Sequence, residues 1–258
     1  MKIATWNVNS INVRLEQMRD WLAKSGADVL CIQETKTVDE NFPVDGIREL
    51  GFEAVFTGEK SYNGVAIVSK YEMSEVQKNF PDDDVDAPKR LIAATVKGVR
   101  IVNTYIPNGT ELWTDKFDFK LDWLQRLRKF FEASFERDSD VLLCGDFNVA
   151  PEEPDVWSVK NWEGKLHFSI PERAALDHVR MWGFTDLYRL RNGDLQEFSW
   201  WNYRQGAFPK NQGLRIDHVW ASESLASKCT DCYIDREPRT WERPSDHTPV
   251  VAEFELDR

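Results

Sequence analysis

The stretch VLLCGDFNVA, residues 141–150, decides the fold that we expect for this chain. It opens on a run of apolar residues, which is typical of a strand buried on both faces. Asp146 and Asn148 follow this strand directly. Strand ends on a rigid sheet are where polar side chains converge, so the stretch predicts a buried sheet with a functional site at its edge.

Helices are indicated in three places by apolar residues at helical spacing. The first predicted helix ends at Gly26, and a long second one covers residues 113–136. Ser169 and Glu172 have the spacing of a capping box, which predicts a third helix that stops near Gly183.

Strands are indicated by short apolar runs bounded by turn residues. The runs at 64–70, 90–96 and 99–106 follow one another closely, and we expect them to form an antiparallel meander. No linker or low-complexity tract interrupts the chain, so we expect one α/β domain over residues 1–258 with layered sheets. Further strands are expected at residues 2–8, 27–34, 140–148, 214–222 and 248–256.

Composition narrows the classes of protein. The chain has 258 residues, of which 41% are hydrophobic, and this excludes a disordered or fibrous protein. No apolar run approaches the roughly 18 residues of a membrane helix, so no membrane partner is expected. The N-terminus lacks the apolar segment of a signal peptide, and we expect a cytoplasmic protein with reduced cysteines. The net charge of −11, taken alone, disfavours a nucleic-acid partner.

Polar residues end six of the predicted strands or adjoin them. Any one of them is commonly a turn residue. Together they offer carboxylate and amide oxygens, which suit a hard cation such as Mg²⁺ or Mn²⁺ and do not suit zinc. No serine or cysteine stands beside a base, so the set indicates metal-assisted attack of water on a phosphate ester. The positions are Asn7, Glu34, Tyr105, Asp146 with Asn148, Asp217, and Asp246 with His247.

Eight motifs occur in an order that resembles the exonuclease III family of DNA-repair nucleases, which includes the abasic endonucleases and belongs to the deoxyribonuclease I-like superfamily. The resemblance runs from about residue 3 to residue 255. It implies an α/β four-layer sandwich in which two mixed β-sheets pack face to face between helices, with the active site at one edge. The motifs are WNVNSI, IQETK, YNGVAIVSK, YIPNG, GDFNVAP, FSWWNYR, GLRIDHV and PSDHTPV.

The resemblance implies a role for each of the polar residues. Glu34 is expected to be the principal metal ligand with Asn7 beside it, and Asp246 to lie in the outer shell of the metal or to bind a second ion. Asp146 would orient or deprotonate the attacking water. The remaining residues would hold the water or donate to phosphate oxygens: Asn148, Tyr105, and His247 paired with Asp217.

Binding of DNA is expected from residues 198–215, where Arg204, Lys210 and Arg215 alternate with aromatic residues and no acidic residue occurs. Residues 87–104 add four basic residues and no acidic one, so the negative total does not exclude DNA. The resemblance implies that Trp200, Leu214 and Ile216 line a pocket for a flipped abasic sugar, although Trp200 also suits a core. Further DNA contacts implied are Asn9, Lys36, Lys89, Arg90 and Asn108.

His167 complicates the choice of substrate. Abasic endonucleases of this family often carry a smaller residue in the loop that borders the sugar pocket. A histidine there would block a flipped abasic nucleotide and favour 3′-end processing. The alternative is an exposed loop histidine without a role.

The expected activity is that of a Mg²⁺-dependent DNA-repair phosphodiesterase, with Mn²⁺ able to substitute. It would act as a monomer on double-stranded DNA with 3′ ends, nicks or abasic sites, by 3′→5′ exonuclease action, 3′-phosphate trimming or cleavage 5′ to abasic sites. A phosphoinositide or sphingomyelin phosphodiesterase of the superfamily would not be expected to carry SWWNYR with LRID. An inactive DNA-binding regulator would be expected to lack Glu34, Asp146 or His247.

Overall fold

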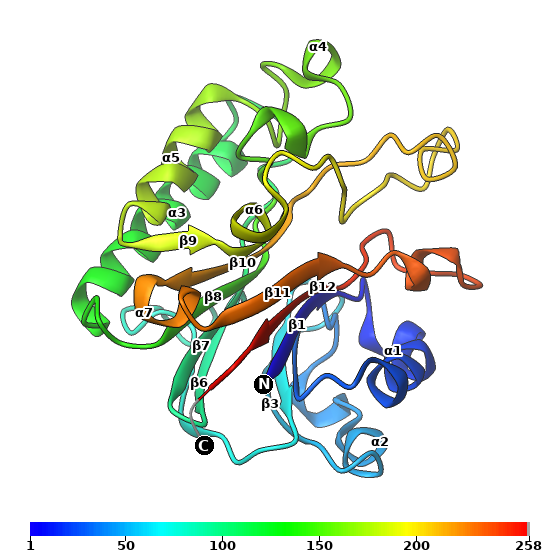
Figure 1. Ribbon diagram of the computed structural model, residues 1–258, viewed down its shortest axis with the longest axis vertical. Coiled ribbons are helices and arrows are strands. Elements are labelled where there is room, and N and C mark those ends of the chain that lie inside the picture. Colours follow the sequence, from blue (N-terminus) through cyan, green and yellow to red (C-terminus); the bar gives the residue numbers. More distant parts are fainter. Residues whose placement is uncertain (257–258) are drawn as a thin grey trace.

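Two six-stranded sheets form the centre of the molecule (Figure 1), and the computed structural model describes residues 1–256. The first sheet has the order β11-β12-β1-β2-β4-β3 and the second has the order β5-β6-β7-β8-β10-β9. The first contains β1 (Lys2–Asn7), β2 (Val29–Gln33), β3 (Glu53–Thr57), β4 (Val65–Ser69), β11 (Cys229–Ile234) and β12 (Val250–Phe254). The second contains β5 (Ser74–Lys78), β6 (Leu91–Val96), β7 (Val99–Tyr105), β8 (Val141–Asp146), β9 (Phe184–Asp186) and β10 (Asp217–Ser222).

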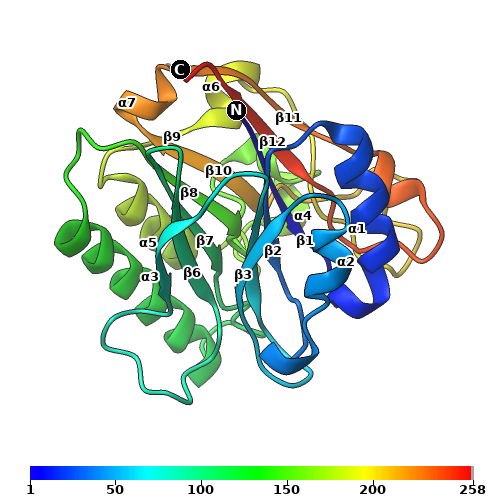
Figure 2. The same cartoon turned by 90° about the horizontal axis from the view of Figure 1, so that it is seen from below.

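Helices cover the outer face of each sheet, as Figure 2 shows, so the predicted four-layer α/β sandwich is confirmed. The first sheet is covered by α1 (Ile11–Ser25) and α2 (Val44–Arg48), and the second by α3 (Asp115–Ser134) and α5 (Ile170–Arg180). Shorter helices are α4 (Val159–Trp162), α6 (Leu187–Asn192) and α7 (Glu223–Ala226). None of the helices found in residues 1–256 has the length and apolar character that crossing a membrane requires.

The local signals for helix ends are confirmed. The first helix ends at Gly26, whose φ of 69° is the left-handed conformation of a C-cap. Thr114 caps α3 by accepting a hydrogen bond from the backbone of Phe117. Ser169 and Glu172 form the predicted capping box at the start of α5.

The predicted meander is wrong. β4 pairs with β2 and β3 in the first sheet, whereas β6 and β7 pair with each other in the second. The chain crosses between the sheets through β5, whose mostly exposed SEVQK sequence gives no apolar run to mark it as a strand. Every residue of β4 is buried, because this strand is covered by the second sheet on one face and by helices on the other.

A largely apolar core joins the two sheets and includes all four free cysteines. One polar contact crosses it. Gln33 Nε2 donates to Asn103 Oδ1 over 2.6 Å, and Asn103 Nδ2 donates to the carbonyl oxygens of Ile32 and Ala66, each over 2.9 Å. Because hydrogen bonds are directional and apolar packing is not, this contact fixes the two sheets against each other.

The strand registers bring the predicted polar residues to one edge. β1 and β2 are parallel, as are β7 and β8, so their carboxyl ends coincide. Tyr105 lies opposite Asp146, and Asp146 lies opposite Asp217 at the start of the antiparallel strand β10. Asn7 ends β1 at the same edge of the first sheet.

Gly145 allows β8 to approach β7 closely at this edge. Its φ is 137°, and an added Cβ would overlap the carbonyl of Thr104. We expect Gly145→Ala to lower the free energy of unfolding by about 3 kcal/mol, measured by urea denaturation. Gly183→Ala is the matched control, since its φ is 132° but a Cβ meets nothing within 4 Å, and about 1 kcal/mol is expected there. Equal losses in the two variants would contradict the importance of the close approach.

Candidate active site

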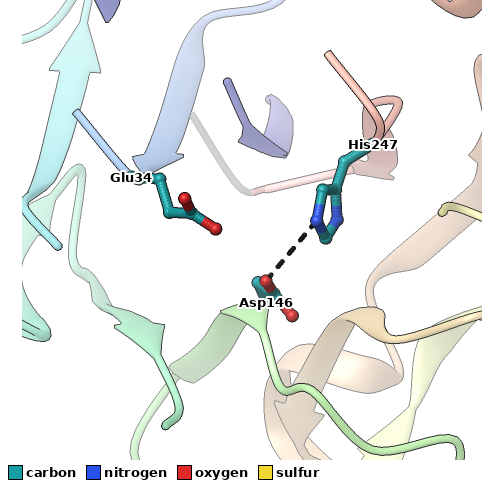
Figure 3. A group of neighbouring side chains, drawn as sticks. All are labelled: Glu34, Asp146 and His247. Atoms are coloured by element: carbon teal, nitrogen blue, oxygen red, sulfur yellow. Dashed lines mark ion pairs between the residues drawn. The ribbon is translucent and has the colours of Figure 1, made fainter. Parts of the chain in front are cut away.

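Three ionisable side chains meet at the edge where the two sheets come together (Figure 3). Glu34, Asp146 and His247 each offer an atom within 4.8 Å of the others. Glu34 follows β2, Asp146 ends β8 and His247 precedes β12, so both sheets contribute. Glu34 has a φ of 53°, and its carbonyl accepts a hydrogen bond of 2.8 Å from the backbone of Ser10, which holds this turn in place.

Asn7 connects the two carboxylates. Its Nδ2 donates to Glu34 Oε1 over 2.8 Å and to Asp146 Oδ2 over 2.9 Å, and its Oδ1 accepts from the backbone of Asn9 over 3.0 Å. The amide nitrogen therefore faces the acidic pair. In this arrangement Asn7 is a bridge between carboxylates, and its direct ligation of a metal stays a prediction.

The oxygen atoms of Glu34 and Asp146 fit a hard divalent cation. Two carboxylates this close repel each other unless positive charge lies between or beside them. Lys36 supplies part of that charge, with Nζ 2.7 Å from Glu34 Oε2. Asp246 lies outside the group of three, where its carboxylate accepts from Asn9 Nδ2 over 2.9 Å and from Trp200 Nε1 over 3.0 Å. Its role toward a metal stays a prediction.

His247 and Asp217 form the pair expected from the sequence. The distance from His247 Nδ1 to Asp217 Oδ2 is 2.9 Å, and from His247 Nε2 to Asp146 Oδ2 it is 3.7 Å. Burial by itself would lower the pKa of His247, but the Asp217 and Asp146 carboxylates outweigh it and raise the pKa to about 10. The ring is thus an imidazolium at neutral pH, which makes it a hydrogen-bond donor and not a metal ligand.

Asp146 titrates in the neutral range. Burial raises its pKa to about 7; the positive charge of His247 opposes this rise, and the Asp217 and Glu34 carboxylates add to it. The backbone of Asn148 donates to Asp146 Oδ1 over 2.9 Å and fixes the carboxylate. A carboxylate with this pKa is suited to take a proton from water.

Tyr105 is held as a phenol. Burial and the Glu34 and Asp146 carboxylates raise its pKa well above the ordinary value, so it stays a hydrogen-bond donor. The guanidinium of Arg90 lies 4.7 Å from the centre of its ring and donates to its carbonyl over 3.2 Å. Arg90, predicted to contact DNA, thus supports Tyr105.

Asn148 and Asn108 face each other across the loops that follow β8 and β7. Asn108 Nδ2 donates to Asn148 Oδ1 over 3.1 Å, and Asn148 Nδ2 donates to the carbonyl of Ile106 over 3.0 Å. The side-chain amide of Asn148 is therefore held in one orientation.

The prediction that Arg215 contacts DNA is wrong. Arg215 is 0% exposed, and its guanidinium pairs with Asp155 over 2.6 Å and with Asp186 over 2.8 Å. Two acidic residues distant in the sequence thus neutralise it inside the protein. Of the three basic residues in this segment, Arg204 and Lys210 are exposed.

The prediction that Leu214 and Ile216 line a sugar pocket is also wrong for this arrangement. They are 0% and 2% exposed, because they pack with Phe168 beneath Trp200. Trp200 is half-buried and contributes both to this cluster and to the site, where its Nε1 donates to Asp246.

Fewer positively charged side chains are free near the site than the sequence indicates. Lys97 lies in the turn between β6 and β7, and Arg100 lies near it, so both lie toward the opposite end of the strands from Tyr105. Lys89 donates its Nζ to the carbonyl of Val85, while Lys36 donates to Asn9 Oδ1 over 2.6 Å.

A groove of about 590 Å³ adjoins Trp200. Three tryptophans and two cationic residues stand among those that line it, namely Trp157, Trp162, Trp200, Lys165 and Arg204.

His167 lies between this groove and the catalytic edge. It is 8% exposed, so the alternative of an exposed loop histidine is wrong. Its Nδ1 lies 2.7 Å from the carbonyl of Asn148, which requires Nδ1 to carry the proton. The ring centre is 6.2 Å from that of Trp200 and 6.5 Å from that of Trp162.

Sequence reasoning missed four residues that hold the site. Ser199 Oγ donates to Asp217 Oδ2 over 2.6 Å. Ser245 Oγ donates to the carbonyl of Asn7 over 2.7 Å and so ties the segment before His247 to β1. Lys120 and Glu172 form a buried ion pair beside Asn148. The motifs FSWWNYR and PSDHTPV contain the two serines, whereas the capping box revealed Glu172 only as a helix start.

Comparison with known proteins identifies the family of this chain. Residues 4–247 match the profile of the Endonuclease/Exonuclease/phosphatase family. The chain is 34% identical to exodeoxyribonuclease III of Haemophilus influenzae, over 98% of this chain and 100% of that relative.

Two solved structures have nearly the same fold. A 3′ phosphatase from Neisseria bound to product DNA hairpin has a TM-score of 0.95 and 40% identity, covering 99% of this chain and 100% of its own. An AP endonuclease from Archaeoglobus fulgidus has a TM-score of 0.95 and 38% identity, with the same coverage. The chain therefore belongs to the Endonuclease/Exonuclease/phosphatase family, in the exonuclease III group of DNA-repair hydrolases.

Proposed function

We propose that this chain is a Mg²⁺-dependent DNA-repair phosphodiesterase that acts mainly at 3′ ends, removing 3′-phosphates and terminal nucleotides. The observation that carries this choice is the buried ring of His167, anchored to the carbonyl of Asn148 between Trp162 and Trp200. The relatives named above include a 3′ phosphatase and an AP endonuclease, so family membership alone does not decide between these substrates.

The chemistry is hydrolysis of a phosphate ester. Glu34 would hold the cation, which would neutralise charge on the phosphate when bound. Asp146, with its pKa near neutrality, takes a proton from the attacking water as the new P–O bond forms. The imidazolium of His247 and the phenol of Tyr105 donate hydrogen bonds to phosphate oxygens. The bond from phosphorus to the leaving oxygen then breaks, and that oxygen takes a proton from solvent water.

His167 would exclude a flipped abasic nucleotide by filling its space. Burial and the nearby Lys120 ammonium lower the pKa of His167 to about 4, so the ring is neutral. Its Nδ1–H is engaged with Asn148, which leaves no donor on the ring for a phosphate. A terminal phosphate needs no such pocket and can reach Asp146 directly.

We propose Mg²⁺ as the cation, with Mn²⁺ able to replace it, because the available donors are oxygens. The partner would be double-stranded DNA with a nick or a 3′ end, contacted by Arg204, Lys210 and Lys165 next to the groove. We propose further that the chain acts as a cytoplasmic monomer.

Replacing His167 by glycine tests the substrate choice. We expect His167→Gly to raise kcat/KM on an internal abasic duplex by at least about 10-fold, because the ring is removed at a φ of 73° that glycine tolerates. Removal of phosphate from a 3′-phosphate nick should change by less than about 3-fold, and EDTA should abolish both. The exposed His178→Gly is the matched control. No gain on the abasic duplex would contradict the proposed exclusion.

Replacing Asp217 tests the imidazolium. We expect Asp217→Asn to lower kcat on a 3′-phosphate nick by about 100-fold. Asp217 raises the pKa of His247, and activity requires the protonated ring, so activity should be lost at lower pH in the variant than in the wild type, where loss is expected near pH 10. The measurement is kcat between about pH 6 and 11. If kcat falls at the same alkaline pH in the variant as in the wild type, His247 is ruled out as the protonated donor.

A further inference from the structure

A charged pair is completely buried between α3 and α5. Lys120 and Glu172 are both 0% exposed, with Lys120 Nζ 2.5 Å from Glu172 Oε1. Lys120 Nζ also donates to the carbonyl of Asn148 over 2.8 Å and to the carbonyl of Asn108 over 3.2 Å. All three ammonium protons are thus used, and two of them hold the loops that carry catalytic amides.

Glu172 binds the loop of His167 by accepting hydrogen bonds from its backbone. Its Oε1 accepts from the backbone of His167 over 3.0 Å, and its Oε2 accepts from the backbone of Ser169 over 3.2 Å. The pair therefore joins three loops that are distant in the sequence, those at Asn108, Asn148 and His167.

His167 depends on this pair for its position. Its φ of 73° is in the left-handed region, which costs a side-chain-bearing residue about 1 kcal/mol or more. Three hydrogen bonds hold it there. The backbone of Ala150 donates to the carbonyl of His167 over 2.8 Å, and the other two bonds involve the pair. One of these two runs from the backbone of His167 to Glu172, and the other from its ring to the Asn148 carbonyl that Lys120 also binds.

A buried ion pair is a poor source of stability, since apolar residues of equal volume commonly serve as well. Its location next to the site is better explained by the loop positions that it fixes. Resting on the proposed function, we propose that Lys120 and Glu172 are positioning residues that hold His167 and Asn148 in one arrangement and thereby set the preference for 3′ ends over abasic sites. Both side chains are 0% exposed, so neither is placed to contact the substrate directly.

The test measures kcat and KM in the presence of Mg²⁺ on two DNA substrates, one with a 3′-phosphate nick and one with an internal abasic site. We expect Lys120→Met to lower kcat on the nick by about 30-fold with KM within about 3-fold, because Asn148 is misplaced. The ratio of abasic cleavage to phosphate removal should rise at least about 10-fold, because His167 is released. Lys120→Arg keeps the positive charge, so its ratio should lie much closer to the wild-type value than that of Lys120→Met.

Arg128→Met is the matched control. Arg128 lies two turns further along α3 and also binds α5, through the carbonyl of His178, but away from the site. It should lower the melting temperature and leave the substrate ratio within about 2-fold.

A double-mutant cycle gives the decisive outcome. If the pair acts through His167, Lys120→Met added to His167→Gly should raise the ratio no further. Full additivity, or an unchanged ratio in Lys120→Met, would overturn the proposal. Where Lys120→Met fails to fold, the double variant Lys120→Met with Glu172→Gln carries the same expectations, since it leaves no unpaired buried charge. Wild-type protein that hydrolyses neither DNA would instead overturn the proposed function.

Discussion

The packing of the two sheets against each other is the constraint on which the site depends. Glu34 and Asn7 come from one sheet, and Asp146 and Asp217 from the other. A shift of one residue along a strand moves a side chain by roughly 3.3 Å, which would break the hydrogen bond between Asn7 and Asp146. Apolar packing alone does not fix such a register, because it has no direction. The buried contact of Gln33 with Asn103 supplies that direction.

Charge is arranged around this edge so that an acidic cluster can receive an anion. Asp146 and Glu34 would repel a phosphate if they stood alone. His247 remains an imidazolium because Asp217 supports it, and Lys36 pairs with Glu34. The net charge of −11 therefore says little about DNA. Equally, counting basic residues along the sequence overstates the DNA surface, since Arg215 is neutralised inside the protein and Arg90 supports a tyrosine.

The sequence predicted those strands and site residues that are marked by their immediate neighbours in the chain. Apolar runs located β1, β2, β4, β6, β7, β8, β10 and β12, and the polar residues at their ends located the site. Which sheet receives β4 is decided by pairing with distant strands, and no local pattern shows it. The burial of Arg215 and Lys120 likewise depends on partners that are far away in the chain, Asp155 and Glu172. The ring of His167 is anchored to the carbonyl of Asn148, 19 residues before it. Long-range neutralisation of a charge leaves no mark on the residues next to it.

The strand order of the first sheet has a consequence for assembly of the site. β12, near the end of the chain, lies between β1 and β11, and His247 enters the site just before it. Without β12, one side of β1 has no pairing strand, and His247 is not held beside Asp146. Glu34 and Asp146 precede His247 in the sequence, and the three side chains come together only when β12 pairs with β1. With this strand order, the candidate site is complete only when the first sheet is complete.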